Sequence, residues 1–320
     1  MNKLERILLN LPPVKFVTDR SKHIILPGFD RVPLYDVGVF FFEQVKKVGL
    51  TERASAVSYN FIMAIPPTCL FLFTLIPQLP FIRKRSVQWE LKRIIRDMIP
   101  APEYNKEIIK FVDGFWNDPK IGLLSFGFIL LIFFASNGMM GLMRSFNKNY
   151  IGFQRRTGLQ TRWAAIKLTL LMMGLIFSCL LLLSLQGIVL SWMGISSNFV
   201  KSIIKFVRWG FLIALIFYAF GFIYKYAPAI KKRWSIVSPG SILATFLSIL
   251  STVGFSLFVS SFGKYNALYG SIGTIIVLMI VIYINSLVLL IGYELNVSIH
   301  SIKALSDERV KHETSGQLAK

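Results

Sequence analysis

The sequence has little charge for its length, and the charge that it has is unevenly distributed. Only 16% of the 320 residues are Asp, Glu, Lys or Arg, whereas 54% are hydrophobic. Soluble domains carry about 25% charged residues. Six stretches contain no charged residue at all: 54–82, 121–143, 168–200, 209–224, 234–263 and 265–293. This pattern excludes an ordinary soluble domain, because too little amphipathic material remains to cover six apolar helices.

The sequence is also poor in the residues that bind metals or form disulfides. It has two cysteines, Cys69 and Cys179, which lie in apolar stretches and form no paired motif. Its three histidines, His23, His300 and His312, lie outside those stretches. We find no zinc-protease, serine-hydrolase or phosphate-loop motif. We therefore expect no metal, no cofactor and no enzyme, although a catalytic group assembled from distant residues would leave no sequence motif.

Acidic residues are scarce relative to basic ones. The chain has 16 Asp and Glu against 36 Lys and Arg, which gives a formal net charge of +20. Such an excess fits either nucleic-acid binding or cytoplasmic loops that lie next to anionic lipid headgroups. We favour the second interpretation because of the apolar stretches, so we expect membrane lipids and no nucleic acid as partners.

The apolar stretches predict membrane-spanning helices, since about 20 apolar residues cross the hydrocarbon core of a bilayer. The predicted spans cover residues 56–77, 121–143, 168–192, 203–225, 238–262 and 272–296. The fourth reaches this length only if Lys205 and Arg208 extend toward the membrane surface. The predicted fold is an all-α, polytopic membrane bundle of six transmembrane helices, which occupies residues 34–300 between a polar segment, 1–33, and a polar tail, 301–320.

Three further segments predict amphipathic helices, at about 34–50, 86–99 and 105–117. In the first, apolar side chains fall on one face, with charged residues off it: Val37, Phe41, Val45 and Val48. Amphipathic helices next to a span often lie in the membrane interface. We expect the same of the first, and we expect the other two to pack on the membrane surface or over the bundle.

The distribution of Lys and Arg predicts that both chain ends are cytoplasmic. The loop 144–167 has six basic residues and no acidic one, and the loop 225–235 has four basic residues. The intervening loops, 194–208 and 263–271, have three and one. Residues 83–85, all basic, oppose this orientation, but they lie in a long loop where the rule weakens.

The first predicted span contains two adjacent prolines, Pro66 and Pro67. Proline removes a helical hydrogen-bond donor, and unpaired carbonyls in hydrocarbon need another partner. One interpretation is a broken helix that lines a cavity, with Tyr59 and Asn60 nearby. The other is a kink needed for packing, and the sequence leaves both open.

Glu294 is the one acidic residue within or bordering the last two predicted spans. An ionisable group at membrane depth is a candidate functional residue; the alternative is an interfacial residue that pairs with a Lys or Arg from a loop. We expect Asn285, in the same span, to share its helix face. Asn137, near the end of the second span, is interpreted as a hydrogen-bonding contact between helices or as part of a cavity.

Several short motifs together resemble one known family. They are the run Arg53 to Tyr59, Tyr224-Lys225-Tyr226-Ala227-Pro228, the Tyr265 to Gly273 segment, and Gly292 to Asn296. The motif residues are Arg53, Asn147, Pro228, Pro239, Gly240, Tyr269, Gly270 and Asn296. Over about residues 35–300 the chain resembles the YihY/virulence factor BrkB family, formerly labelled ribonuclease BN-like. The resemblance implies a bacterial inner-membrane protein, with about six spans and cytoplasmic ends.

These observations support three hypotheses of function. The first is an envelope transporter, exporter or lipid-handling protein, whose substrate is a lipid or a small solute. The second is a non-transporting membrane scaffold or regulator that binds partners through its amphipathic helices. The third, less favoured, is a membrane-bound hydrolase or nuclease. The sequence carries no signal for the oligomeric state.

Overall fold

The structure is a computed structural model of the whole chain. It describes residues 19–29, 32–47, 49–75, 89, 92, 109–110, 113, 121–146, 153–154, 156–192, 198–230, 233–261 and 271–318. The described part contains seven helices: α3 (Leu34–Lys47), α4 (Leu50–Leu75), α7 (Ile121–Phe146), α8 (Gly158–Trp192), α9 (Asn198–Tyr226), α10 (Pro239–Ser261) and α12 (Ser271–Leu318). No strand occurs among these residues apart from an isolated antiparallel bridge between Phe153 and Ile230. The predicted all-α class is confirmed.

Within the described residues, three segments are long and apolar enough to cross a membrane. They are Phe128–Phe146 of α7, Gly158–Ser178 of α8 and Leu278–Ser306 of α12. Shorter apolar segments, Gly210–Tyr226 and Pro239–Phe255, lie in α9 and α10. The structure therefore supports an apolar membrane protein, and crossing by all six predicted spans stays a prediction.

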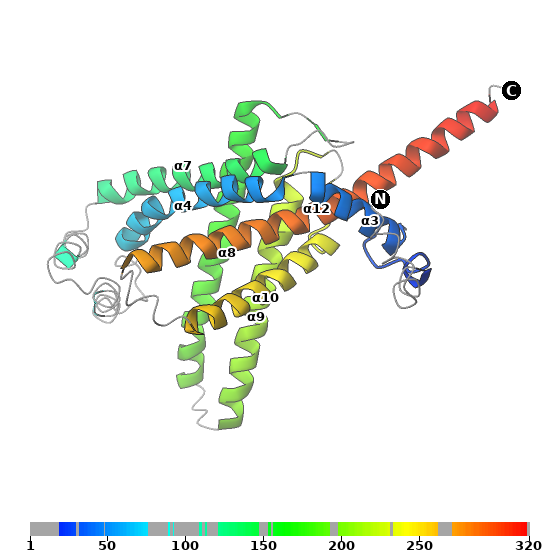
Figure 1. The fold of residues 1–320 in the computed structure, drawn as a ribbon. Helices are drawn as coiled ribbons and strands as arrows, with labels where there is room; N and C mark the ends of the chain where they lie inside the picture. The colour runs from blue at the N-terminus through cyan, green and yellow to red at the C-terminus, as the bar shows by residue number, and fades with distance from the viewer. Residues whose placement is uncertain are drawn as a thin grey trace.

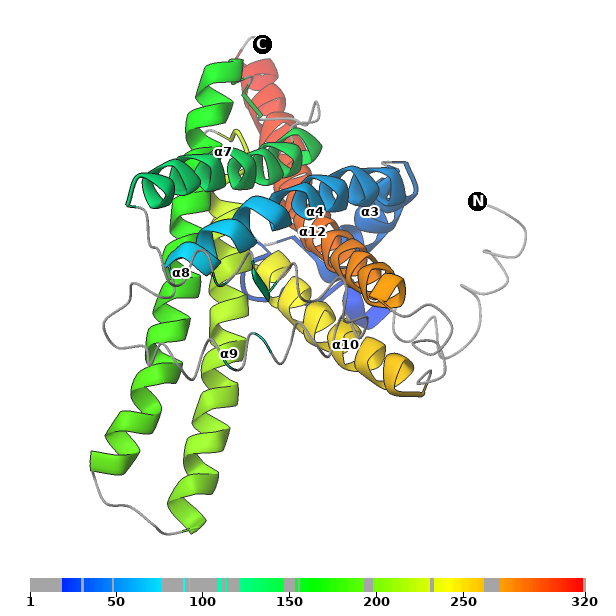
Figure 2. The ribbon, with the colours of Figure 1, turned by 90° about the vertical axis from the view of Figure 1, so that its left-hand side faces the viewer.

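Most buried apolar side chains lie at one end of the six long helices, which we call the convergent end. It comprises the start of α4, the end of α7, the start of α8, the end of α9, the start of α10 and the middle of α12. Successive helices contribute alternately their first and their last residues to this end, so they run in alternating directions. From this end α4, α7, α10 and α12 extend together, whereas α8 and α9 form a hairpin that leaves in another direction (Figures 1 and 2).

The first long helix, α4, continues without interruption through Pro66 and Pro67. Of the two interpretations of these prolines, the broken helix does not fit this continuous helix, and the kink needed for packing stays a prediction. Each proline removes one hydrogen-bond donor, but the hydrogen bonds of the turns on both sides persist. A helix accommodates the lost hydrogen bonds by bending. Figure 1 shows such a change of direction in the cyan part of α4.

Two predicted boundaries also differ from the structure. The first amphipathic helix, predicted to reach residue 50, ends at Lys47, and Gly49 with φ of 63° separates it from α4. A glycine takes this left-handed conformation at low cost, so it ends one helix and starts the next. At the other terminus, α12 continues to Leu318, so the segment expected as a tail is part of the last helix (Figure 1).

The short helix α3 packs on α12 through a small apolar cluster. Val37 is buried together with Phe29, Val32 and Ile299. The opposite side of α3 is open, and Phe42 is 65% exposed. The other predicted amphipathic helices, 86–99 and 105–117, lie almost wholly outside the described residues, although Lys92 and Asp113 form an ion pair of 2.8 Å that links the two segments.

Candidate functional site

The convergent end contains a buried ion pair between the first and last long helices. Arg53 of α4 donates from Nη1 to Glu294 Oε1 of α12 at 2.5 Å. Arg53 Nη2 donates to the carbonyl oxygen of Ser145 in α7. The Glu294 side chain has no exposed surface and that of Arg53 is 8% exposed. One guanidinium therefore ties three helices together around a carboxylate shielded from solvent.

Aromatic residues lie near this pair, and two tyrosine hydroxyls donate to backbone carbonyls of neighbouring helices. Tyr293 stacks on Phe146, with ring centroids 3.8 Å apart, and its hydroxyl donates to the Phe146 carbonyl at 2.7 Å. Tyr224, from the end of α9, donates its hydroxyl to the Leu289 carbonyl at 2.8 Å. These bonds join α7 and α9 to α12. The Phe146 carbonyl is at the last residue of α7 and lacks a partner within its own helix, so the Tyr293 hydroxyl removes a cost of burial.

The start of α10 packs against α12 through two glycines and an asparagine. The Gly240 N–H donates to Asn296 Oδ1 at 2.9 Å, and Asn296 Nδ2 donates to Ser238 Oγ at 3.0 Å. A Cβ atom on Gly240 would collide with the Gly292 carbonyl oxygen. The absence of side chains at both positions lets the two backbones approach closely. Asn296 thus caps the first turn of α10 from another helix, a role in which a local residue is more usual.

The candidate cavity residues do not gather in one place. Tyr59 is 61% exposed and Pro66 is exposed, both on the outer surface of α4. The Asn60 amide donates to Ala56 and packs against Gly141 of α7. Asn137 accepts a hydrogen bond from Arg162 of α8 at 2.5 Å. The Pro67 side chain lies outside what the structure describes.

Asn285 and Glu294 face different neighbours, so the expectation that they share a helix face is wrong. Asn285 Oδ1 accepts a hydrogen bond from Ser248 Oγ of α10 at 2.7 Å, whereas Glu294 faces α4. Nine residues separate the two, which is two and a half turns at about 3.6 residues per turn. Their side chains therefore point to opposite sides of α12. Asn285 and Asn137 both connect helices, and a functional role for either stays a prediction.

Several residues that carried the family resemblance meet at the convergent end. Arg53 pairs with Glu294, Gly240 and Asn296 bond to each other, Pro239 begins α10, and the Pro228 carbonyl accepts a hydrogen bond from Arg156 Nη2 at 3.1 Å. Three others, Asn147, Tyr269 and Gly270, lie outside the described residues.

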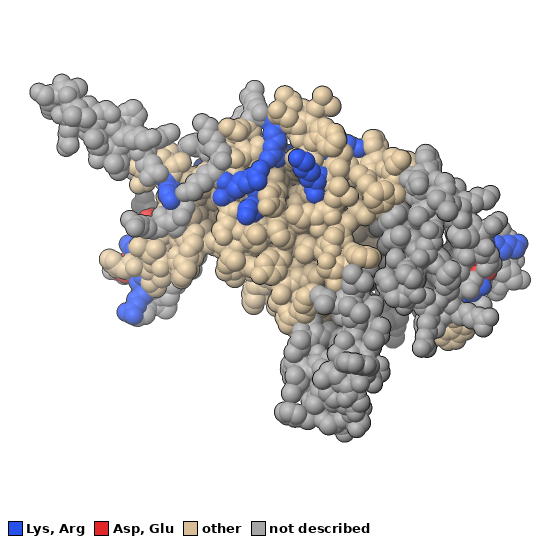
Figure 3. Space-filling model, turned by 180° about the vertical axis from the view of Figure 1, so that it is seen from behind, with Lys and Arg blue, Asp and Glu red and all other residues tan. Residues whose placement is uncertain are grey.

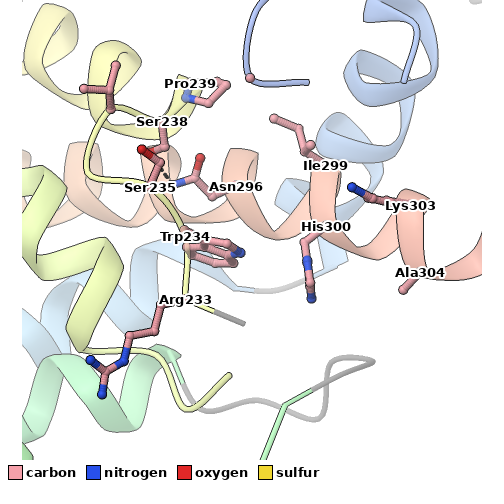
Figure 4. A pocket seen from close by; sticks show the side chains of 12 residues that line it. Arg233, Trp234, Ser235, Ser238, Pro239, Asn296, Ile299, His300, Lys303 and Ala304 are labelled. Atoms are coloured by element: carbon pink, nitrogen blue, oxygen red, sulfur yellow. Dashed lines mark hydrogen bonds between the residues drawn. The ribbon is translucent and has the colours of Figure 1, made fainter. Parts of the chain in front are cut away.

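A pocket of about 380 Å³ lies beside this network, between the segment before α10 and the middle of α12. Asn296, His300 and Lys303 line one wall, and Trp234 and Ser238 line the other (Figure 4). None of the lining residues is acidic. The indole Nε1 of Trp234 is buried and has no hydrogen-bond partner among the residues that the structure describes. A basic pocket with a buried spare donor is suited to an anionic or carbonyl-bearing group.

The start of α8 contains residues that the sequence analysis did not single out. Thr157 and Gln160 form a reciprocal capping box: the Thr157 N–H donates to Gln160 Oε1 at 3.1 Å, and the Gln160 N–H donates to Thr157 Oγ1 at 3.4 Å. This motif was readable as Thr-x-x-Gln before an apolar run. Arg156 Nη1 donates to the Ala227 carbonyl at 2.9 Å and so caps the end of α9. That contact joins positions 71 residues apart, and no local pattern announces it.

No group of three or more His, Cys, Asp or Glu side chains that could hold a metal occurs within the searched, described residues. The polar groups of the convergent end are instead bonded to one another and to backbone carbonyls. In chemical terms, the arrangement holds a desolvated charge pair and offers a basic pocket beside it.

Apolar helices of membrane-crossing length, joined by buried polar contacts at one end, define an integral membrane protein of the all-α class. The chain belongs to the family described as Virulence factor BrkB, whose family model matches residues 41–316.

Several curated proteins are similar over most of their length. The "Putative ribonuclease-like protein YfkH" of Bacillus subtilis (strain 168) is 32% identical over 265 residues, which cover 82% of this chain and 94% of that protein. The "UPF0761 membrane protein NTHI0384" of Haemophilus influenzae is 25% identical over 270 residues, with 82% and 95% covered. A "UPF0761 membrane protein" of Tolumonas auensis is 26% identical over 263 residues, with 80% and 82% covered. No solved structure matches the chain.

Proposed function

We propose that the protein is a multi-pass transporter, exporter or lipid-handling protein of the bacterial inner membrane, with both chain ends in the cytoplasm. The observation that carries this proposal is the buried pair of Arg53 and Glu294, which joins the first and last long helices. Taking two charges out of water costs several kcal/mol per ion, and well-packed apolar residues would join the helices without that cost. Ionisable groups that are buried between membrane-spanning helices typically mark a substrate path or its gate.

In this proposal the first pocket is the entrance. Asn296 lines it on the side of α12 that faces α10, whereas Glu294 faces α4. A substrate that entered at Trp234, His300 and Lys303 would meet basic but no acidic side chains, so the favoured substrate carries negative charge. In this proposal the ion pair closes the path at the convergent end, and its opening would separate α4 from α12.

Purified protein in proteoliposomes tests the proposal with two probes. Vesicles that contain phosphatidylglycerol with a fluorescent headgroup report lipid movement between leaflets, through the fraction that external dithionite reduces. Vesicles loaded with carboxyfluorescein report the passage of a small anion. We expect wild-type protein to accelerate at least one signal over protein-free vesicles, and Glu294→Gln to slow it several-fold.

Two further variants separate the site from general damage. Asn60→Ala tests the one candidate on α4 that faces a neighbouring helix, and Glu43→Gln removes an exposed carboxylate of α3 that pairs with Lys47. We expect the Glu43 variant to match the wild type. Signals no faster than those of protein-free vesicles with either probe would count against transport, and an unchanged rate in Glu294→Gln would remove that residue from the mechanism.

The alternative is a non-transporting scaffold or regulator. It is supported by the exposed apolar face of α3, where Phe42 is 65% and Val39 is 44% exposed, and by the length of α12. Neither pocket described for this structure is lined by Pro66 or Glu294. A crosslinking experiment with a photoreactive residue at Phe42 would favour this alternative if it captured a protein partner rather than lipid.

A membrane-bound hydrolase or nuclease is the third candidate. Its support is the printed name of the Bacillus subtilis relative, which describes that protein as ribonuclease-like. Degradation of a labelled RNA by the purified protein, abolished by Glu294→Gln, would favour it over transport.

A further inference from the structure

A second pocket, of about 350 Å³, lies on the outside of the convergent end, between the start of α8 and the segment that follows α9. Three cations line it: Arg156, Lys167 and Arg233. Figure 3 shows Lys and Arg side chains gathered on this face of the molecule within uncharged surface. In Figure 4 the Arg233 guanidinium points away from Trp234 and His300, which belong to the first pocket. Arg233 lines both pockets, and its guanidinium is directed away from the first.

The charge of the second pocket is not neutralised by the protein. No acidic residue lines it, and none of the three cations takes part in an ion pair within the described part of the chain. Arg156 donates to the carbonyls of Ala227 and Pro228, which carry no full charge. Burial, and then the neighbouring charge of Arg233, lower the pKa of Arg156. Two guanidinium groups therefore repel each other there, and a bound anion would relieve the repulsion.

Apolar side chains stand next to these cations. Leu159 and Trp163 are 78% and 64% exposed, and with Lys167 they follow one another at four-residue intervals along α8. Farther along the same face of this helix, Leu170 and Phe177 are 43% and 41% exposed. Tryptophan is enriched where membrane proteins meet lipid headgroups, and a lysine there extends its charge toward the headgroups. The exposed surface of α8 therefore has a charged part followed by an apolar part. This order matches the charged headgroup and the apolar chains of a phospholipid.

The pocket is held in place by the contacts at its edges. The capping box of Thr157 and Gln160 fixes the first turn of α8, one turn before Trp163. Arg233 packs over the ring of Tyr226, with the guanidinium carbon 5.2 Å from the ring centroid. The guanidinium groups of Arg156 and Arg233 are therefore held by contacts within the protein, which reduces the entropy lost when an anion binds.

We propose that this pocket binds the phosphate of an anionic glycerophospholipid, with Arg233 and Lys167 at the phosphate, Trp163 beside the headgroup and glycerol, and the acyl chains along the exposed apolar stripe farther down α8. This inference is independent of transport, because a bound lipid could equally anchor the α8–α9 hairpin in a scaffold. Its occupant is a lipid rather than a soluble anion because the exposed apolar stripe continues from the cations along α8.

Fluorescence quenching by brominated lipids tests the proposal on the full-length protein. The protein is reconstituted in phosphatidylcholine vesicles with a minor fraction of brominated phosphatidylglycerol, or of brominated phosphatidylcholine as reference. Comparison with Trp163→Phe isolates the signal of Trp163. We expect phosphatidylglycerol to quench Trp163 more strongly than phosphatidylcholine. The double variant Lys167→Gln/Arg233→Gln is expected to weaken this preference by about fivefold for each cation removed.

Controls of equal charge make the outcome specific. Lys22→Gln/Lys47→Gln removes two exposed lysines that pair with Asp19 and Glu43, and it should keep the preference. Arg233→Lys keeps the positive charge and should also keep most of the preference for phosphatidylglycerol. This variant therefore separates the effect of losing the charge from the effect of losing the fold. Equal quenching by the two lipids, or an unchanged preference in the Gln double variant, would overturn the proposal. Abolition of the preference by inorganic phosphate at unchanged ionic strength would show a site for a free anion instead.

Discussion

At the scale of single residues, the feature that distinguishes this protein is a charge pair withdrawn from solvent. Arg53 holds Glu294 and the carbonyl of Ser145 with two of its nitrogens, while its Nε has no partner among the described residues. A buried pair contributes little net stability compared with apolar residues of the same volume, but the loss of one partner leaves a bare charge. The two kinds of substitution therefore have different expected effects.

Removal of one member of the pair should destabilise the fold more than replacement of both. We expect Glu294→Ala to lower the free energy of unfolding by about 3–5 kcal/mol, and Arg53→Met/Glu294→Leu to cost clearly less than the sum of its single variants. Thermal unfolding in detergent micelles measures both. Glu43→Gln, at an exposed pair on α3, should cost under about 0.5 kcal/mol. Strict additivity in the double variant would mean that the two side chains are not coupled.

The sequence singled out Glu294 by its position, whereas Arg53 was named only as a residue of the family motif. Glu294 is conspicuous because acidic residues are rare in apolar stretches. Arg53 is not, since an arginine just before a span looks like an ordinary membrane anchor. The two lie 241 residues apart, and only the packing of α4 against α12 brings them together. For the same reason the sequence offered a loop residue as the partner of Glu294.

At the scale of helices, the close contact of α10 with α12 depends on glycines. Gly240→Ala would place a methyl group against the Gly292 carbonyl and the Asn296 amide, and Gly292→Ala would place one 2.5 Å from the Tyr224 hydroxyl oxygen. Since backbone atoms cannot yield as a flexible side chain does, each should cost at least about 1–3 kcal/mol.

Gly254 provides the matched control on the same helix, because a methyl group there would meet nothing within 4 Å. Gly254→Ala should leave the melting temperature unchanged or slightly raise it, since alanine is the better helix former. Equal losses of melting temperature at Gly240 and Gly254 would show that the contact with α12 is not the cause.

The start of α8 offers a second prediction at this scale. Thr157→Ala removes the side-chain acceptor of the capping box, and we expect it to cost about 1 kcal/mol. Arg156→Gln leaves the carbonyls of Ala227 and Pro228 without their donor, so amide hydrogen exchange should rise at the end of α9. Gln154→Ala, at an exposed side chain nearby, should change neither quantity. Unaltered exchange in Arg156→Gln would show that the end of α9 does not depend on this contact.

The sequence predicted which segments are helical, but it predicted the ends and bends of the helices less well. Apolar runs without charge predicted helices where α7 to α12 occur, because their length and uniform hydrophobicity leave few alternatives. Pro66 and Pro67 suggested a break, but the turns on both sides kept α4 in one piece. The continuation of α12 to Leu318 was hidden because its last part is polar, and the hydrophobic pattern that marks a span stops before it.

At the scale of the whole molecule, six helices meet at one end and diverge from it. Basic residues border that end: Arg144, Arg156, Lys167, Lys225, Arg233 and Lys303. Placed in the cytoplasm, they would satisfy the preference of Lys and Arg for the inner side. Exposed apolar side chains cover the helices beyond it, among them Phe133 of α7, Leu250 of α10 and Met279 of α12. This distribution supports a membrane-embedded body with a polar end, which we propose lies in the cytoplasm.

The structure constrains the membrane crossing of the α8–α9 hairpin less than that of the other long helices. It leaves the convergent end in a different direction from the other four long helices (Figure 2). The sequence predicted its two apolar stretches but not its direction, because direction depends on contacts between helices that hydrophobicity alone does not encode. If α8 and α9 both cross, residues 193–197 between them lie on the far side of the membrane from Ser235.

Cysteine accessibility in intact cells tests the six-span arrangement most directly. In a variant without Cys69 and Cys179, single cysteines replace Ser197, between α8 and α9, and Ser235 or Leu305, at the convergent end. We predict that a membrane-impermeant maleimide added to intact cells labels the cysteine at 197, and labels those at 235 and 305 only after the membrane is opened. Labelling of 197 and 235 from the same side would contradict the account, because the hairpin would then not cross the membrane.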